Sequence, residues 1–210
     1  MAKKNAFVLS FTVGGLLYHE SIVLADAYAE RRNWAHAIEQ VESQNLMQSR
    51  TASTAVRKLR EVRQRLQGLS EDQLRLLAHG SRSDQRLLLW LACCRRYQLI
   101  RDFAIEVVRS KFLQLDLLIT LADIDRFVEI KCVWYEEIEK LSESTRQKLQ
   151  TVMMRMLRES ELVTSEGVIV SPMISDELLR AIVAESPESL TVFPIADDDR
   201  YRNAHEARLK

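Results

Sequence analysis

Residues 83–97 read SDQRLLLWLACCRRY, and eight consecutive apolar residues, Leu87 to Cys94, stand at the centre of this stretch. An apolar run of this length without glycine or proline predicts a helix that is buried on most of its circumference. The rest of the chain has a similar character, because only five glycines and three prolines, the residues that most often interrupt helices, occur in 210 residues. The sequence therefore predicts an all-α protein built around this central helix.

Apolar residues recur at helical spacing on both sides of the central helix. Further helices are predicted at about 15–31, 33–45, 51–66, 71–78, 99–112, 123–131, 134–140, 144–160 and 175–184. Residues 115–121 fit a strand or a helix end equally well, because a short apolar run does not separate the two. Gly80 marks a boundary between two helical lobes, residues 1–80 and 81–185. The remainder, residues 186–210, is predicted to be a polar tail.

A small β-hairpin is expected to interrupt the helical pattern. Residues 162–170 read LVTSEGVIV, which are two short β-type runs around a Ser-Glu-Gly turn. They follow the long helix predicted at 144–160, and the short helices predicted at 123–131 and 134–140 precede it. Two helices, a longer helix and a hairpin follow one another in this order in winged helix-turn-helix domains. Residues 123–171 are therefore a candidate winged helix-turn-helix unit.

Composition and charge narrow the classes of function. Thirty basic residues balance thirty acidic residues, so an argument for nucleic-acid binding must rest on where the charges lie. The cysteines, Cys93, Cys94 and Cys132, form no regular disulfide pattern, which favours a reducing compartment. The uncharged stretch 5–18 imitates a signal peptide, but it is too short to cross a bilayer. We therefore predict a cytoplasmic protein without a membrane partner.

The sequence contains no catalytic or cofactor motif that we recognise. The four histidines stand neither at His-Glu-x-x-His spacing nor at zinc-ligand spacing from a cysteine. Gly14-Gly15 lacks the Lys-Ser/Thr that follows in phosphate-binding loops, and no Gly-x-Ser-x-Gly elbow is present. Asp197-Asp198-Asp199 lies in a stretch dense in charge and is interpreted as solvated charge rather than as a metal site. The prediction is a non-enzymatic protein without catalytic residues, metal or cofactor.

Two predicted helices carry basic residues on an outward side, and the first spans residues 51–66. Its predicted buried stripe is Val56, Leu59, Val62 and Leu66. Its candidate nucleic-acid contacts are Arg50, Thr51, Ser53, Arg57, Lys58, Arg60 and Arg63, with Arg65 beside them. If all six cations engaged phosphates, log K would fall with log salt at a slope of about −5. The alternative is a solvated helix face whose arginines pair with acidic residues elsewhere.

The second basic helix is the one predicted at 144–160. Its candidate contacts share one outward side and are Lys148, Thr151, Arg155 and Arg158. A helix of this kind fits the major groove, where Arg and Lys reach base edges and phosphates. Many winged domains bind protein instead, and the wing predicted here carries Glu166 and neither Lys nor Arg. The pattern therefore leaves nucleic acid and protein open as partners of this unit.

Four segments of the sequence carry a resemblance to a known family. They are LSFTVGGLLYHES at 9–21, NLMQSRTASTAVRKLREVRQRL at 45–66, LSESTRQKLQTVMMRMLRESEL at 141–162 and SPESLTVFP at 186–194. Together they resemble the BrxA family of bacterial bacteriophage-exclusion (BREX) defence systems, over nearly the whole chain. The resemblance implies a small, helical, non-enzymatic, DNA-binding protein that acts beside a methyltransferase, an ATPase and a phosphatase-like protein. It also implies a similarity to NusB-type antitermination proteins, which bind RNA.

Residues and resemblance together predict a protein that binds double-stranded DNA with little or no sequence specificity, within a phage-exclusion complex. Its predicted partners are duplex DNA and other BREX proteins. Phosphates would be anchored by cations of both basic helices, and Thr51, Ser53 and Thr151 would add neutral hydrogen bonds to phosphates. Two alternatives remain: an RNA-binding regulator of the NusB kind, and a protein adaptor whose basic sides dock on acidic partner surfaces.

Overall fold

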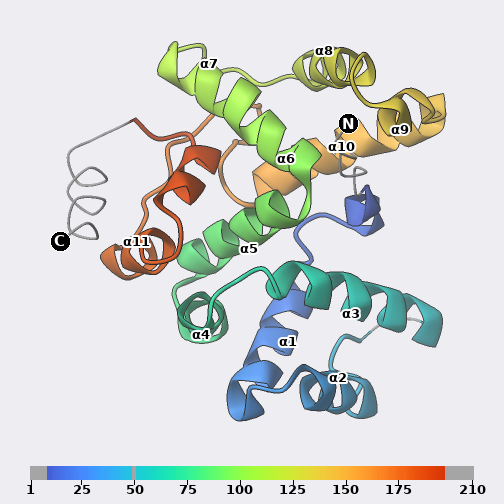
Figure 1. Cartoon of the computed structure of the whole chain (residues 1–210), viewed down its shortest axis with the longest axis vertical. Coiled ribbons are helices and arrows are strands. Elements are labelled where there is room, and N and C mark those ends of the chain that lie inside the picture. The colour runs from blue at the N-terminus through green and yellow to red at the C-terminus, as the bar shows by residue number, and fades with distance from the viewer. Residues whose placement is uncertain (1–8, 49–50, 197–210) are drawn as a thin grey trace, which may run out of the picture.

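The computed structural model describes residues 9–48 and 51–196, and this part of the chain is mainly helical, as predicted (Figure 1). Its first helices are η1 (Ser10–Val13), α1 (Tyr18–Arg31), α2 (Trp34–Ser43), α3 (Ala52–Leu66), α4 (Glu71–His79) and α5 (Arg82–Arg96). They are followed by α6 (Gln98–Phe103), η2 (Ala104–Arg109), α7 (Ser110–Leu113), α8 (Leu121–Cys132) and α9 (Glu136–Glu139). The last are α10 (Glu143–Glu159), α11 (Asp176–Val183) and η3 (Pro187–Val192).

The central helix of the fold is α5, the element predicted from the apolar run. Its residues from Leu87 to Cys94 are all buried, and α5 contacts α1, α3, α4, α6, α10 and η3. The indole Nε1 of Trp90 donates a hydrogen bond of 2.9 Å to the carbonyl oxygen of Val192. Burial raises the pKa of the Cys93 and Cys94 thiols, so both stay protonated. These cysteines therefore act as small apolar core residues, as the sequence indicated.

Most of the α-helices, as distinct from the elements labelled η, begin where a short polar side chain can accept a backbone hydrogen bond. Asn33 caps α2, Thr51 caps α3, and Ser142 caps α10 in this way. Ser70 and Gln73 form a reciprocal capping box at the start of α4. These residues explain why the helix boundaries fall close to those expected from the sequence.

The hydrophobic core runs without interruption across the lobe boundary predicted near residue 80. One cluster of buried residues includes Leu66 and Leu77 from before Gly80 and Trp90 and Phe103 from after it. Polar contacts also connect the two sides, because the side-chain amide of Gln73 donates to the carbonyl oxygen of Ala181 at 2.9 Å. The halves on either side of residue 80 thus share one core.

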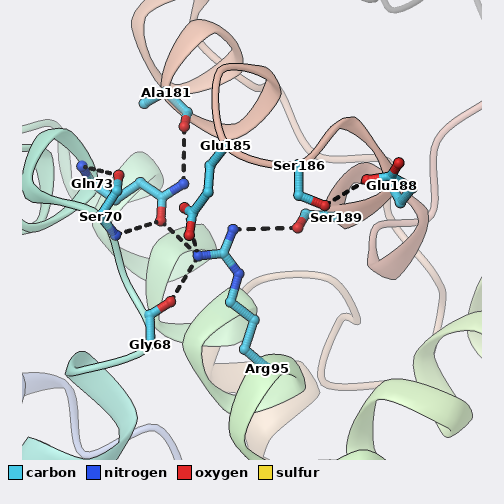
Figure 2. A network of polar contacts seen from close by, with 9 residues as sticks. All are labelled: Gly68, Ser70, Gln73, Arg95, Ala181, Glu185, Ser186, Glu188 and Ser189. Atoms are coloured by element: carbon cyan, nitrogen blue, oxygen red, sulfur yellow. Dashed lines mark hydrogen bonds and ion pairs between the residues drawn. The ribbon is translucent and has the colours of Figure 1, made fainter.

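Arg95 of α5 ties the two halves together in a network of polar contacts (Figure 2). Its Nη1 donates to the carbonyl oxygen of Gly68 at 2.8 Å and to a side-chain oxygen of Gln73 at 2.9 Å. The same nitrogen lies 2.9 Å from a carboxylate oxygen of Glu185, and Nη2 lies 3.3 Å from the hydroxyl of Ser189. One guanidinium therefore connects α5 to α4, to η3 and to the turn that follows α11.

The polar tail predicted from residue 186 does not begin there. Leu190, Val192, Phe193 and Ile195 are buried against the rest of the core. Prolines and acids stand among the apolar residues of this segment, which gives it a polar character in the sequence. Residues 197–210, which hold the rest of the predicted tail, lie outside the described residues.

The predicted β-hairpin is not formed as two regular strands within the described residues. Instead, residues 117–119, 162–164 and 167–170 form what we call the mini-sheet, joined by the antiparallel bridges Leu118–Val168 and Val163–Ile169. Gly167, with φ of 93°, lies against the carbonyl oxygen of Ile119 so closely that a Cβ there would come within 2.5 Å of it. Turns next to these segments keep the strand pairing of the mini-sheet short. The run at 115–121, left open by the sequence, is thus in part extended.

The helices α8, α9 and α10 follow one another in the order that a winged helix-turn-helix requires, and α8 packs against both others. The assignment of this unit as a winged helix-turn-helix stays a prediction. Lys131 of α8 binds Asp102 at 3.1 Å and Glu106 at 2.7 Å, which fixes α8 to the helical segment 98–113. No helix in the described part of the chain combines the length and apolar character needed to cross a membrane.

Candidate nucleic-acid interface

The helix α3 turns its buried side to the core and a basic side to solvent. Leu59, Val62 and Leu66 are buried, as predicted, but Val56 is 54% exposed, so the apolar stripe begins one turn later than expected. Arg57 and Arg60 lie on the exposed side. Neither side chain makes a hydrogen bond or an ion pair with another described residue, so their charges are available to a ligand.

The remaining cations predicted on α3 differ in their surroundings. Arg63 is half-buried and has no carboxylate partner among the residues that the structure describes. The ammonium of Lys58 lies 2.7 Å from a carboxylate oxygen of Glu20 on α1, so a phosphate would have to compete with that pair. Arg50 lies outside the described residues.

Arg65, expected beside the basic side of α3, is instead buried with 1% of its side chain exposed. Its Nε lies 3.4 Å from a carboxylate oxygen of Glu61 and donates to the hydroxyl of Tyr97 at 3.0 Å. Its Nη1 donates to the carbonyl oxygen of Gly15 at 2.7 Å. The physical reason is its position, since Arg65 follows Val62 by three residues and shares the buried side of the helix. Arg65 is therefore a structural residue.

The hydroxyl groups predicted to bind phosphate have partners within their own helices. Thr51 accepts a hydrogen bond from the backbone nitrogen of Thr54 as the cap of α3, and its hydroxyl contacts that of Ser53 at 3.3 Å. Thr151 donates to the carbonyl oxygen of Gln147 at 2.9 Å. The cations are therefore the stronger candidates for contact with a polyanion.

The helix α10 also presents its predicted basic side to solvent. Lys148, Thr151, Arg155 and Arg158 are all exposed. The side chains of Lys148 and Arg155 make no hydrogen bond or ion pair with any other described residue. Arg158 donates to the carbonyl oxygen of Ser165 at 2.9 Å and so connects α10 to the turn of the mini-sheet. Lys148 and Arg155 thus resemble Arg57 and Arg60 in carrying uncompensated charge.

The two basic helices border one cleft. The segment η1 packs against both α3 and α10, and Figure 1 shows this start of the described chain (blue) between them. Beside it lies a cleft of about 600 Å³. It is lined by Gly14, Gly15, Leu17, Tyr18, Glu20, Lys58, Arg86, Arg155 and Glu159. Lys58 of α3 and Arg155 of α10 therefore face the same space, although 97 positions separate them in the sequence.

Arg86, which also lines this cleft, is not predicted as a site residue from the sequence. Its guanidinium forms an ion pair with Glu161 and lies over the ring of Tyr18, 5.8 Å from the centroid. The sequence gives little indication of a site role for Arg86, because this residue directly precedes the apolar run of α5. Glu20 pairs with Lys58 and Glu161 with Arg86, whereas Arg155 lines the cleft beside Glu159 without an ion pair to it. Within the cleft the uncompensated positive charge is therefore that of Arg155, and the exposed cations Arg57, Arg60 and Lys148 lie outside its lining.

A close contact between Gly15 and Glu159 holds the N-terminal segment against α10. The carboxylate of Glu159 accepts a hydrogen bond of 2.5 Å from the backbone nitrogen of Leu16. A Cβ on residue 15 would overlap the same carboxylate oxygen. Only glycine leaves room for this contact at the edge of the cleft.

We expect Gly15→Ala to displace the Glu159 carboxylate and to break its hydrogen bond to the Leu16 nitrogen. Loss of one charge-assisted hydrogen bond should lower the free energy of unfolding by about 1.5–3 kcal/mol. Urea denaturation followed by circular dichroism measures this change. Gly14→Ala is the matched control, because a Cβ there meets only the flexible end of the Leu17 side chain. Equal stability of the two variants would contradict the assigned role of Gly15.

The fold and its surface define a helical protein with uncompensated cations on two helices that border one cleft. A solved structure of an uncharacterised protein from Magnetospirillum magneticum shares the fold, with a TM-score of 0.75 and 20% sequence identity over 89% of this chain and 96% of that one. Residues 5–186 match the BrxA family, and this chain belongs to that family.

A BREX protein BrxA from Escherichia coli O9:H4 (strain HS) is a curated relative of this chain. It is 28% identical over 109 residues, which make up 50% of each sequence. The match thus spans about half the length of that relative. The family expected from the four sequence segments is confirmed.

Proposed function

We propose that this protein binds double-stranded DNA through phosphates along the outward sides of α3 and α10, as a component of a BREX system. The observation that carries this proposal is a group of cations on α3 and α10 without a carboxylate partner among the described residues: Arg57, Arg60, Arg63, Lys148 and Arg155. In a chain without net charge, such a group is a surface on which a polyanion can dock. Contacts to the phosphates of DNA carry little information about its sequence, so the binding is weakly sequence-specific.

The BREX assignment rests on the family and on the name of the curated relative. Its partners would be the other proteins of the system, and its compartment the cytoplasm, where phage DNA is met. Docking on phosphates depends on charge, and no covalent bond has to be made or broken. We therefore propose a binding role without catalysis.

The salt dependence of DNA binding tests this proposal. Each phosphate contact on duplex DNA contributes about −0.9 to the slope of log K against log salt, so five cations predict a slope of about −4.5. Affinity should then fall about 500-fold between roughly 50 and 200 mM salt. Fluorescence anisotropy with a short labelled duplex at several salt concentrations measures the slope.

The same experiment separates the alternatives. A duplex RNA of matching sequence, titrated at one salt concentration, should bind no more tightly than the DNA. Tighter binding of RNA would contradict the proposal and favour a NusB-like regulator. An absence of binding to either duplex at low salt would also contradict it and favour an adaptor that docks on acidic protein surfaces.

A further inference from the structure

An apolar surface surrounds the mini-sheet on the side that faces solvent. Leu118 and Val168 lie opposite each other in the sheet, and both side chains are exposed. Val170 continues this face, while Leu115 and Leu121, 83% and 52% exposed, stand at the two ends of the edge segment. Proteins that act alone rarely expose contiguous apolar patches of this kind, so the face is a candidate interface.

The edge of the mini-sheet at Leu118 is open. Hydrogen bonds from the Ile119 nitrogen to the Gly167 oxygen (2.8 Å) and from the Ile169 nitrogen to the Leu117 oxygen (2.7 Å) flank the Leu118–Val168 pair. In this pattern the N–H and C=O of Leu118 point away from Val168. Neither group has a partner within the described residues. An unpaired donor and acceptor beside exposed apolar side chains form a template for another strand.

The open edge is only one residue long. The backbone nitrogen of Asp116 donates to the carbonyl oxygen of Lys111 at 3.0 Å, and that of Thr120 donates to a carboxylate oxygen of Asp123 at 2.8 Å. These contacts remove the donors that would extend the pairing to either side. Any occupant therefore gains one pair of backbone hydrogen bonds, and the apolar side chains must supply the rest of the contact.

We propose that a second copy of this chain occupies the edge, with a two-fold axis beside Leu118. Two antiparallel copies would exchange both hydrogen bonds between Leu118 and its counterpart, which is the reciprocal pair that an isologous contact requires. The exposed face of the combined sheet would then be a continuous apolar strip of Val168 and Leu118 from both copies. An unrelated extended peptide gains the same hydrogen bonds but brings no such matching strip.

The charges along the edge suit this register. Antiparallel pairing about Leu118 places Asp116 opposite Thr120 of the other copy, and Leu115 beside Leu121. No carboxylate meets a carboxylate across the axis, so the like-charge repulsion that opposes many edge contacts is absent along this segment. The two most exposed leucines of the segment cover each other.

Disulfide trapping tests the axis. In a hydrogen-bonded antiparallel pair the two Cα atoms lie about 5.5 Å apart, which is within the range that a disulfide spans. Leu118→Cys, made in a Cys132→Ser background, should form a covalent dimer under mild oxidation, since Cys93 and Cys94 are buried. Val168→Cys is the matched control, because three strand spacings, about 14 Å, would separate its two copies.

Sedimentation velocity of the unmodified chain supplies a second measurement. We expect a concentration-dependent dimer that Leu118→Lys converts to monomer with an unchanged circular dichroism spectrum, because two ammonium groups would meet at the axis. A chain that stays monomeric at every concentration overturns the proposal and assigns the edge to a different protein. Dimers that the Leu118→Cys variant traps no better than the Val168→Cys variant overturn it as well, because they use another face.

Discussion

The variant Arg57→Glu/Arg60→Glu is expected to bind duplex DNA about 100-fold more weakly than the unmodified protein at low salt. Each reversal removes about 1 kcal/mol of attraction and adds up to about 1 kcal/mol of repulsion, since unit charges about 4 Å apart in water interact with about 1 kcal/mol, so the two together cost roughly 2–4 kcal/mol. The slope of log K against log salt should also become shallower by about 2, because two contacts are lost. Both side chains are exposed and lack partners within the described residues, so the fold should be retained.

A matched control separates local contacts from total charge. Arg82 and Arg180 are exposed as well, and they lie at the start of α5 and on α11. Their side chains make no hydrogen bond or ion pair with another described residue. Their double replacement by Glu changes the net charge equally but should leave most of the DNA affinity in place. If a folded Arg57→Glu/Arg60→Glu variant bound DNA as tightly as the control, α3 would not be part of the interface.

Replacement of Arg65 by Met should destabilise the protein by about 3–5 kcal/mol, the usual cost of leaving one partner of a buried ion pair uncompensated. Glu61 has only 6% of its side chain exposed, so its carboxylate would have to stay charged without its partner or take up a proton. The hydroxyl of Tyr97 and the carbonyl oxygen of Gly15 would lose a donor at the same time. Urea denaturation measures the loss.

The double variant Arg65→Met/Glu61→Leu should recover part of that stability, because no charge is then left in the core. Arg63→Met, two positions away and without a carboxylate partner among the described residues, should change the free energy of unfolding by less than about 1 kcal/mol. A double variant that is less stable than Arg65→Met would contradict this account, because it would show that an unpaired Glu61 carboxylate is not what destabilises Arg65→Met.

The helices could be predicted from the sequence because their determinants are local. Caps such as Thr51 and Ser142 act within one turn, and the apolar run of α5 allows few alternatives to burial. The short segments were harder to predict. Residues 162–170 have β-type composition, but their pairing depends on Leu118, more than forty positions earlier in the chain.

The candidate interface could be predicted only in part, because charge alone does not reveal how a side chain is used. Arg57 and Arg65 look alike in the sequence, yet one is exposed and the other is buried against Tyr97. Glu61, four residues before Arg65, is a signal of the buried pair that could have been read. The shared cleft of Lys58 and Arg155 could not have been found, since it depends on how η1 separates α3 from α10.

The late position of Val192 in the chain has a consequence for biosynthesis. The indole of Trp90 and the guanidinium of Arg95 both find partners in residues 185–192, nearly a hundred positions downstream. While the ribosome is still adding those residues, the middle of the protein has already been made, but the part of its surface that they cover is still exposed. Folding of the nascent chain therefore waits for residues 185–192, and a product released before they are made would expose apolar surface to chaperones and proteases.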